Sequence, residues 1–405
     1  MSTPDGLPLA RRLGTVDAVT IGLGSMVGAG IFVVLGPAAA AAGSGLLIGL
    51  AVAAVVAYCN ATSSARLAAR YPQSGGTYVY GRERLGEFWG HTAGWSFIVG
   101  KTASCAAMAL TVGYYVWPEW ARGVAVGTVV ALTAVNYVGI RKSALLTRVI
   151  VGLVLAVLGT VVVAVLGFGE IDTVRLSIGA DVSVGGVLQA AGLLFFAFAG
   201  YARIATLGEE VRDPARTIPR AIPLALAIAL AVYALVAVTV LSELGSDALG
   251  SASAPLADAV TAAGLGALDP IVRAGAAVAS VGSLLALILG VSRTTLAMAR
   301  DRHLPRALSR VHPRFGSPHR AEVVVGVVVA VLAATVDVRE AIGFSSFAVL
   351  VYYAIANASA WTLGRRTIPA IGLAGCLLLA FLLPIPSVLA GAGVVLVGAL
   401  AYRRR

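Results

Sequence analysis

Charged side chains are scarce in this sequence of 405 residues. They make up 12% of the chain, against roughly 25% in soluble globular domains. Hydrophobic residues make up 59%, and the mean hydropathy is +0.92. This composition excludes a soluble domain and indicates a polytopic membrane protein. The formal net charge of +11 does not indicate a nucleic-acid partner, because the basic residues occur in short groups between apolar runs, without interleaved aromatics.

The sequence also has few residues of the kinds that perform chemistry. Its three cysteines, Cys59, Cys105 and Cys376, are odd in number and lie in apolar runs, so they predict neither disulfides nor a metal site. The four histidines lie in loops or at the ends of apolar runs, no His-Glu-x-x-His spacing occurs, and no apolar run carries paired carboxylates. We therefore expect neither an enzyme nor a cofactor. No convincing cleavage site follows the first apolar stretch, so we expect that stretch to remain in the mature protein.

Long apolar stretches occupy most of the chain, and each is compatible with a hydrocarbon core of roughly 30 Å. Twelve can be marked, at residues 15–41, 44–67, 87–113, 121–139, 145–168, 185–207, 219–242, 271–299, 321–337, 340–363, 367–383 and 386–402. The sequence therefore predicts an all-α integral membrane protein with 12 transmembrane helices. The last two stretches are separated only by residues 383–386 (LPIP), for which we prefer a tight outer turn to a single re-entrant hairpin.

The distribution of basic residues predicts the orientation of these spans. If the amino terminus is cytoplasmic, most of the 30 Lys and Arg residues fall in or beside cytoplasmic segments. We therefore expect a multi-pass plasma membrane protein with two cytoplasmic termini, residues 1–14 and 403–405. Lys101, Arg203 and Arg293 lie within the spans instead.

The first apolar stretch contains four glycines close together, at residues 22, 24, 28 and 30. Each costs a helix interior roughly 1 kcal/mol relative to alanine, so we expect two half-helices joined by an extended hinge. Unwound backbone inside a membrane survives only where it is buried in protein or lines a cavity. Amides that begin the second half-helix suit a carboxylate, and carbonyls that end the first suit an ammonium or a sodium ion. The alternative is close glycine packing between helices.

A second break is expected in the sixth stretch, where residues 195–203 (FFAFAGYAR) place Gly200 and small residues at mid-span. It follows the first break by five spans. That spacing predicts an inverted repeat of five plus five spans, residues 15–168 and 185–363, with a midplane site and with residues 367–402 outside the repeat.

Five segments in register resemble the amino acid–polyamine–organocation (APC) superfamily of transporters, the amino acid permeases. They are residues 24–32 (GSMVGAGIF), 71–86, 136–143 (NYVGIRKS), 209–219 (EEVRDPARTIP) and 292–305. The resemblance implies a LeuT-like fold with discontinuous first and sixth helices. It further implies a secondary transporter that moves amino acids by alternating access.

By position, the resemblance assigns backbone roles at both breaks. Amides around Ala29 and Gly30 would hold the substrate α-carboxylate, carbonyls of Met26 and of residues 197–199 would hold its α-ammonium, and Phe196 would act as an aromatic gate. The expected substrate site comprises Met26, Val27, Gly28, Ala29, Gly30, Phe196, Ala197, Phe198, Ala199 and Gly200.

Lys101 lies near the middle of the third span, where an ionisable group is a candidate for function. Burial at this depth favours a neutral amine that can accept a proton. The alternative is a structural lysine paired with backbone carbonyls. Proton-coupled relatives carry a lysine in the fifth span, and Val154 stands at that position here. Lys101 could then take over the proton, or the protein could exchange amino acids or act uncoupled. Ser280 and Ser283 could offer hydroxyls near a cation site, although serine is common in membrane helices.

Arg203 follows the second break and is expected to pair with Glu209 or Glu210 in an inner gate, or else to approach a substrate carboxylate. Arg293 is expected to anchor the eighth span at the interface. No Asp or Glu lies deep in any span, which favours small neutral amino acids as substrates. An amino acid or polyamine antiporter for charged substrates, and a channel, remain the alternatives.

Overall fold

The computed structural model describes residues 13–71, 75–139, 144–169, 171–179, 182–205 and 211–403, and these parts are built from helices. The α-helices are α1 (Thr15–Met26), α2 (Ala29–Val33), α3 (Leu35–Ala42), α4 (Leu46–Arg70), α5 (Thr77–Leu85), α6 (Glu87–Val116), α7 (Ala121–Tyr137), α8 (Ala144–Phe168), α9 (Val184–Phe198), α10 (Ala202–Ala205), α11 (Pro214–Ser251), α12 (Pro255–Ala262), α13 (Asp269–Arg300), α14 (His319–Thr335), α15 (Val338–Trp361), α16 (Thr367–Phe381) and α17 (Ile385–Arg403).

The helices follow the apolar stretches closely. In the described part of the chain, nine helical segments are long and apolar enough to cross a membrane, which confirms a multi-pass helical protein. Three further predicted spans are short helices, α7 and α14 with 17 residues each and α16 with 15. The total of twelve spans and the inverted repeat stay predictions.

Two helices, α5 and α12, fall in segments that the apolar pattern leaves as loops. Helix α11 runs well beyond its predicted span, and its interior includes Pro219 and Pro223 near the start. Its path bends at Gly245, where φ is +73° and a residue with a side chain would be strained. Apolarity locates the part of a helix that is inside the membrane, but it does not indicate helical turns beyond it.

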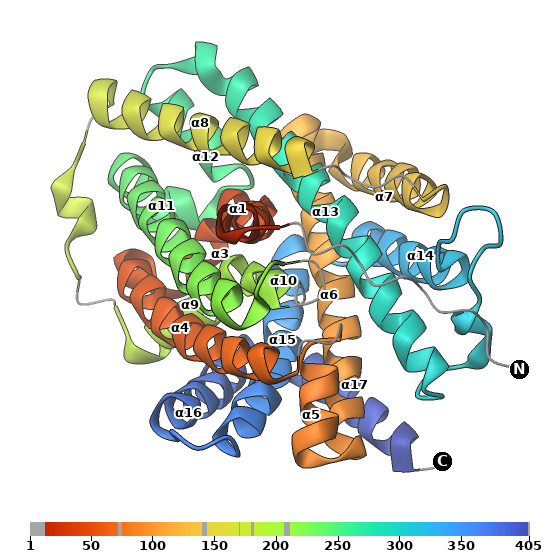
Figure 1. Ribbon diagram of the computed structural model, residues 1–405. Helices are drawn as coiled ribbons and strands as arrows, with labels where there is room; N and C mark the ends of the chain where they lie inside the picture. Colours follow the sequence, from red (N-terminus) through yellow and green to blue (C-terminus); the bar gives the residue numbers. More distant parts are fainter. Residues whose placement is uncertain are drawn as a thin grey trace, which may run out of the picture.

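The broken first span lies at the centre of the bundle (Figure 1). Helix α1 packs against α11 and α8, and α2 packs against α6, α9 and α13. The long helix α6 lies along both α13 and α15. All five residues of α2 are buried, so protein surrounds the unwound backbone beside it.

The chain just before α1 and the chain just before α11 lie at the same end of the bundle. Leu13 forms a parallel bridge with Val211, and the amide of Arg212 donates to the carbonyl of Leu13 over 2.8 Å. Asp17 at the start of α1 pairs with Arg148 at the start of α8. Helices α1, α8 and α11 therefore begin at one face of the bundle. They correspond to predicted spans one, five and seven, which all start on the same side if successive spans alternate in direction.

Candidate functional site

The first span is interrupted where its glycines are densest. Helix α1 ends at Met26, Val27 leaves helical geometry at φ −79° and ψ +51°, and Gly28 is extended at φ −106° and ψ −141° before α2 begins at Ala29. A Cβ at Gly28 would overlap the Ser283 hydroxyl of α13, so only glycine fits this close approach. The predicted hinge is therefore present at the predicted residues.

In the sixth span the α-helix gives way to a 3₁₀ turn at the predicted break, while the backbone stays in the right-handed helical region. Helix α9 ends at Phe198, a short 3₁₀ turn occupies Ala199–Tyr201, and α10 follows. A Cβ at Gly200 would overlap the backbone carbonyl of Ser25 on α1. Because Gly200 has no side chain, the second break can approach the end of α1.

The two breaks meet at one tyrosine, Tyr233 of α11. Its hydroxyl lies 2.5 Å from the carbonyl oxygen of Met26 and 3.0 Å from that of Ala197, and it can donate its proton to either. Gly30 packs on the backbone of Ala197, where an added Cβ would lie 2.9 Å from the Ala197 Cα. Two of the carbonyls expected to receive an ammonium therefore converge on a single hydrogen-bond donor.

A third carbonyl of the site, that of Ala199, faces α6 and α15. The side-chain nitrogen of Lys101 donates to it over 3.4 Å, and the hydroxyl of Tyr353 donates over 3.3 Å. Only 7% of the Lys101 surface is exposed. The lysine therefore lies beside the second break and contacts a backbone carbonyl, as the structural alternative expects. Its role in coupling stays a prediction.

The eighth-span serines lie on the other side of the first break. The Ser283 hydroxyl donates to the carbonyl of Gly24 over 3.3 Å. Ser280 is fully buried, and its hydroxyl has no hydrogen-bond partner among the described residues. Val154 of α8 is buried too, so the position of the missing lysine is filled by an apolar side chain. Ser283 is thus joined to the hinge itself.

The two aromatic residues expected at the second break differ in their contacts. Phe198 is fully buried, and its ring lies 5.1 Å from that of Tyr233. Phe196 is 8% exposed, and its role as a gate stays a prediction. Arg203 is exposed on α10, and its expected partners Glu209 and Glu210 lie outside the described residues.

Sequence reasoning missed the two tyrosines that hold the broken ends, Tyr233 and Tyr353. Each lies in a span that the apolar pattern does locate, but tyrosine at mid-span gives no signal that distinguishes a hydrogen-bonded ring from a packed one. A buried hydroxyl usually has a partner, and here the partners are backbone carbonyls at the two breaks. Only the packing of α11 and α15 against the breaks identifies them.

Comparison with known proteins identifies the family of the chain. A family model described as "Amino acid permease" matches residues 17–371. An uncharacterized transporter of Mycobacterium tuberculosis is 73% identical over 400 residues, which cover 97% of this chain and 91% of the relative. The branched-chain amino acid permease BcaP of Bacillus subtilis is 29% identical, over 82% of this chain and 76% of the relative. The chloroplastic cationic amino acid transporter 7 of Arabidopsis thaliana is also 29% identical, over 87% of this chain and 65% of the relative.

These matches cover the segments that carry both helix breaks, and they name transporters. With its membrane-spanning helices, the chain is therefore a multi-pass membrane transporter and not an enzyme, and it belongs to the amino acid permease family of the APC superfamily.

Proposed function

We propose that the protein is a secondary active transporter that carries small neutral amino acids across the plasma membrane by alternating access, with both termini in the cytoplasm. The substrate α-carboxylate would accept hydrogen bonds from amides at Ala29 and Gly30, where the start of α2 offers unpaired donors. The α-ammonium would donate to the carbonyls of Met26 and Ala197. A zwitterion complements both sets of backbone groups at once.

The observation that carries this proposal is the position of the Tyr233 hydroxyl between the two helix breaks. One proton donor reaches both carbonyl oxygens, at 2.5 and 3.0 Å, so an ammonium in the same place could reach both as well. We infer that the tyrosine supplies the hydrogen bond when substrate is absent. A substrate ammonium would bind the same two carbonyls, either together with the tyrosine hydroxyl or in its place.

The charges around the breaks favour a neutral substrate. Lys101 is the cation that donates to the second break, and the hydrogen bonds to Met26, Ala197 and Ala199 come from it and from two tyrosines. A cationic side chain would be repelled by a charged lysine without a compensating carboxylate. The relatives named for branched-chain and for cationic amino acids show that both substrate classes occur among similar proteins.

The experiment that tests this function is uptake of a panel of labelled amino acids into proteoliposomes, with and without a pH gradient. We expect saturable uptake of small neutral amino acids and counterflow when the vesicles are preloaded. An ohmic current that neither saturates nor shows counterflow would instead identify a channel.

Lys101 is our candidate for the coupling group, since Val154 replaces the usual lysine. We expect Lys101→Ala to abolish the dependence of uptake on the pH gradient while counterflow persists. An unchanged pH response would remove this lysine from the coupling mechanism and leave exchange or uncoupled transport.

A further inference from the structure

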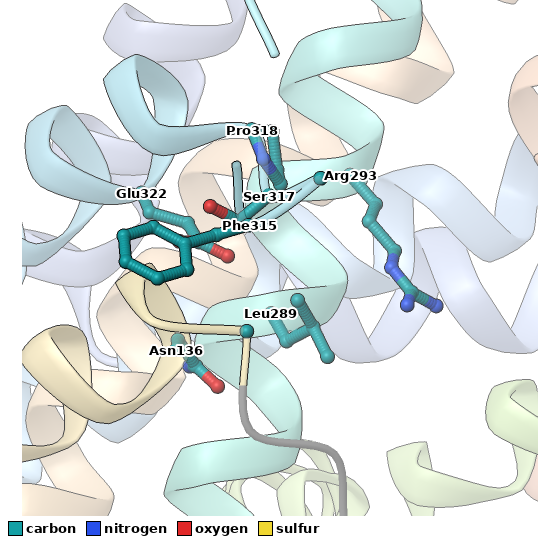
Figure 2. Close-up of a pocket in the computed structure, with 9 residues that line it drawn as sticks. Asn136, Leu289, Arg293, Phe315, Ser317, Pro318 and Glu322 are labelled. Atoms are coloured by element: carbon teal, nitrogen blue, oxygen red, sulfur yellow. The ribbon is translucent and has the colours of Figure 1, made fainter. Parts of the chain in front are cut away.

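A small pocket lies between α7, α13 and α14, away from the two helix breaks (Figure 2). Its volume is about 50 Å³, enough for a few water molecules. Its walls come from the end of α7, from one face of α13 and from the chain that leads into α14. They are Asn136, Gly139, Leu289, Arg293, Phe315, Gly316, Ser317, Pro318 and Glu322.

Glu322 is the buried acid of this pocket. Its exposed fraction is 0%, and neither carboxylate oxygen has a hydrogen-bond partner among the described residues. An ionised carboxylate without donors is costly to bury, whereas the neutral acid is not. The side chain therefore favours a bound proton in the arrangement that the structure describes.

Few charged groups among the described residues lie near Glu322. Helices α6, α7 and α13 and the 3₁₀ turn Arg306–Ser309 pack against α14. Among their described residues, Arg293 of α13 is the one whose charge acts on Glu322, and Figure 2 shows its guanidinium directed away from the acid. On α14 itself, His319 and Arg320 precede Glu322 by one turn or less. The arginine can compensate a carboxylate only if it turns inward.

The outer end of the pocket lies at the protein surface. Arg293 and Gly316 are exposed there, whereas Glu322 at the inner end is fully buried and out of contact with solvent. The chain over the pocket is fastened to the end of α7, because the Ser317 hydroxyl donates to the carbonyl of Tyr137 over 2.8 Å. The amide of His312 donates to the carbonyl of Ser317, also over 2.8 Å. The pocket is closed while these two hydrogen bonds hold the chain over it, and it opens when they break.

The donor set excludes a divalent cation. Calcium takes six to eight oxygen ligands, often with more than one carboxylate. The pocket offers a single carboxylate, that of Glu322, which falls short of such a ligand set. A proton needs one oxygen and no coordination shell.

We propose that Glu322 is a proton-binding site of the transporter, separate from Lys101, and that its proton leaves when the pocket between α7, α13 and α14 opens to water. The carboxylate accepts one proton from solvent and returns one to solvent, and only an O–H bond forms or breaks. Arg293 then turns toward the ionised acid. A role of Glu322 in coupling rests on the proposed transport function. The protonation of Glu322 rests on the pocket alone.

Difference infrared spectroscopy of the purified full-length protein tests the site directly. We expect a carboxylic acid carbonyl band that appears in acidic buffer and is lost in alkaline buffer. Glu322→Gln should lack this band, whereas Glu119→Gln, which changes an exposed acid, should keep it. If Glu322→Gln does not fold, Glu322→Asp should shift the band. A band that is the same in wild type and Glu322→Gln, or that responds to sodium or potassium at constant pH, would overturn the proposal.

Transport measurements then separate the two proposals. In proteoliposomes we expect Glu322→Gln to lose acid-driven accumulation of amino acid and to retain counterflow. Accumulation as pH-dependent as in wild type would overturn a coupling role for Glu322. Absence of any amino acid transport in the wild type would instead refute the proposed function, and the infrared result on Glu322 would stand independently.

Discussion

At the scale of single residues, the phenol of Tyr233 holds the two broken helices together. It is fully buried with its ring against Phe198, so a phenylalanine fills the same space. Tyr233→Phe leaves the carbonyls of Met26 and Ala197 without that donor, at a cost of about 1–3 kcal/mol. We expect a lower thermal unfolding midpoint. Tyr58→Phe, at a tyrosine that is 49% exposed on α4, is the matched control and should leave it unchanged.

Gly30 is a second residue on which the site depends, because it touches the backbone of the other broken helix. A side chain there must displace the Cα of Ala197, which no rotamer change can relieve. We expect Gly30→Val to abolish amino acid binding, measured by isothermal titration or by ligand-induced thermal shift. Gly159→Ala on α8, where nothing lies within 4 Å of an added Cβ, should bind like wild type. Normal affinity in Gly30→Val would refute the site.

At the scale of elements, a polar cluster joins α5 to the end of α13. The hydroxyl of Tyr78 donates to the carboxylate of Asp301 over 2.5 Å and lies 3.0 Å from Nδ1 of His303. Arg82, one turn further along α5, reaches the same carboxylate at 3.2 Å. This cluster fastens a helix that the apolar pattern leaves out.

Burial, with the neighbouring Asp301, raises the pKa of the Tyr78 phenol above its ordinary value. A raised pKa favours the protonated phenol in the folded state. The stabilisation that this phenol gives the folded state is therefore fully present below the unfolded pKa of about 10 and is lost as pH rises beyond it. We expect Tyr78→Phe to lower the thermal midpoint by an amount that stays constant from neutral pH to near that value. If wild type and Tyr78→Phe had the same thermal midpoint at neutral pH, Tyr78 would not stabilise the folded state as we expect.

At the scale of the whole molecule, the distribution of basic residues predicts that both termini lie on the cytoplasmic side. We expect Arg314→Cys, in the segment between α13 and α14, to face the cytoplasm, and Glu119→Cys, between α6 and α7, to face outside. Both positions are exposed, whereas the native cysteines are buried. A membrane-impermeant maleimide should therefore label only the second variant in intact cells. The reverse pattern would invert the predicted topology.

The sequence by itself determined the class of the molecule and the location of its spans. Composition excludes a soluble fold, and helix bounds follow apolar length to within a few residues along most of the chain, because a bilayer rewards long apolar helices regardless of what they contact. Glycine density likewise indicated the first break, since four glycines oppose a continuous helix whatever surrounds it. The motif resemblance led to the correct family.

Only the tertiary structure decided which side chains complete the site. Tyr233 and Tyr353 come from spans far along the chain, and their hydroxyls matter because helices α11 and α15 bring them to backbone carbonyls at the two breaks. Glu322 is the second residue of the predicted span 321–337, and nothing in the sequence marks it as a site. Its burial without a hydrogen-bond partner among the described residues depends on the packing of α7 and α13 against α14. Hydrogen-bond partners and burial are properties of contacts between distant segments, and local sequence pattern does not encode them.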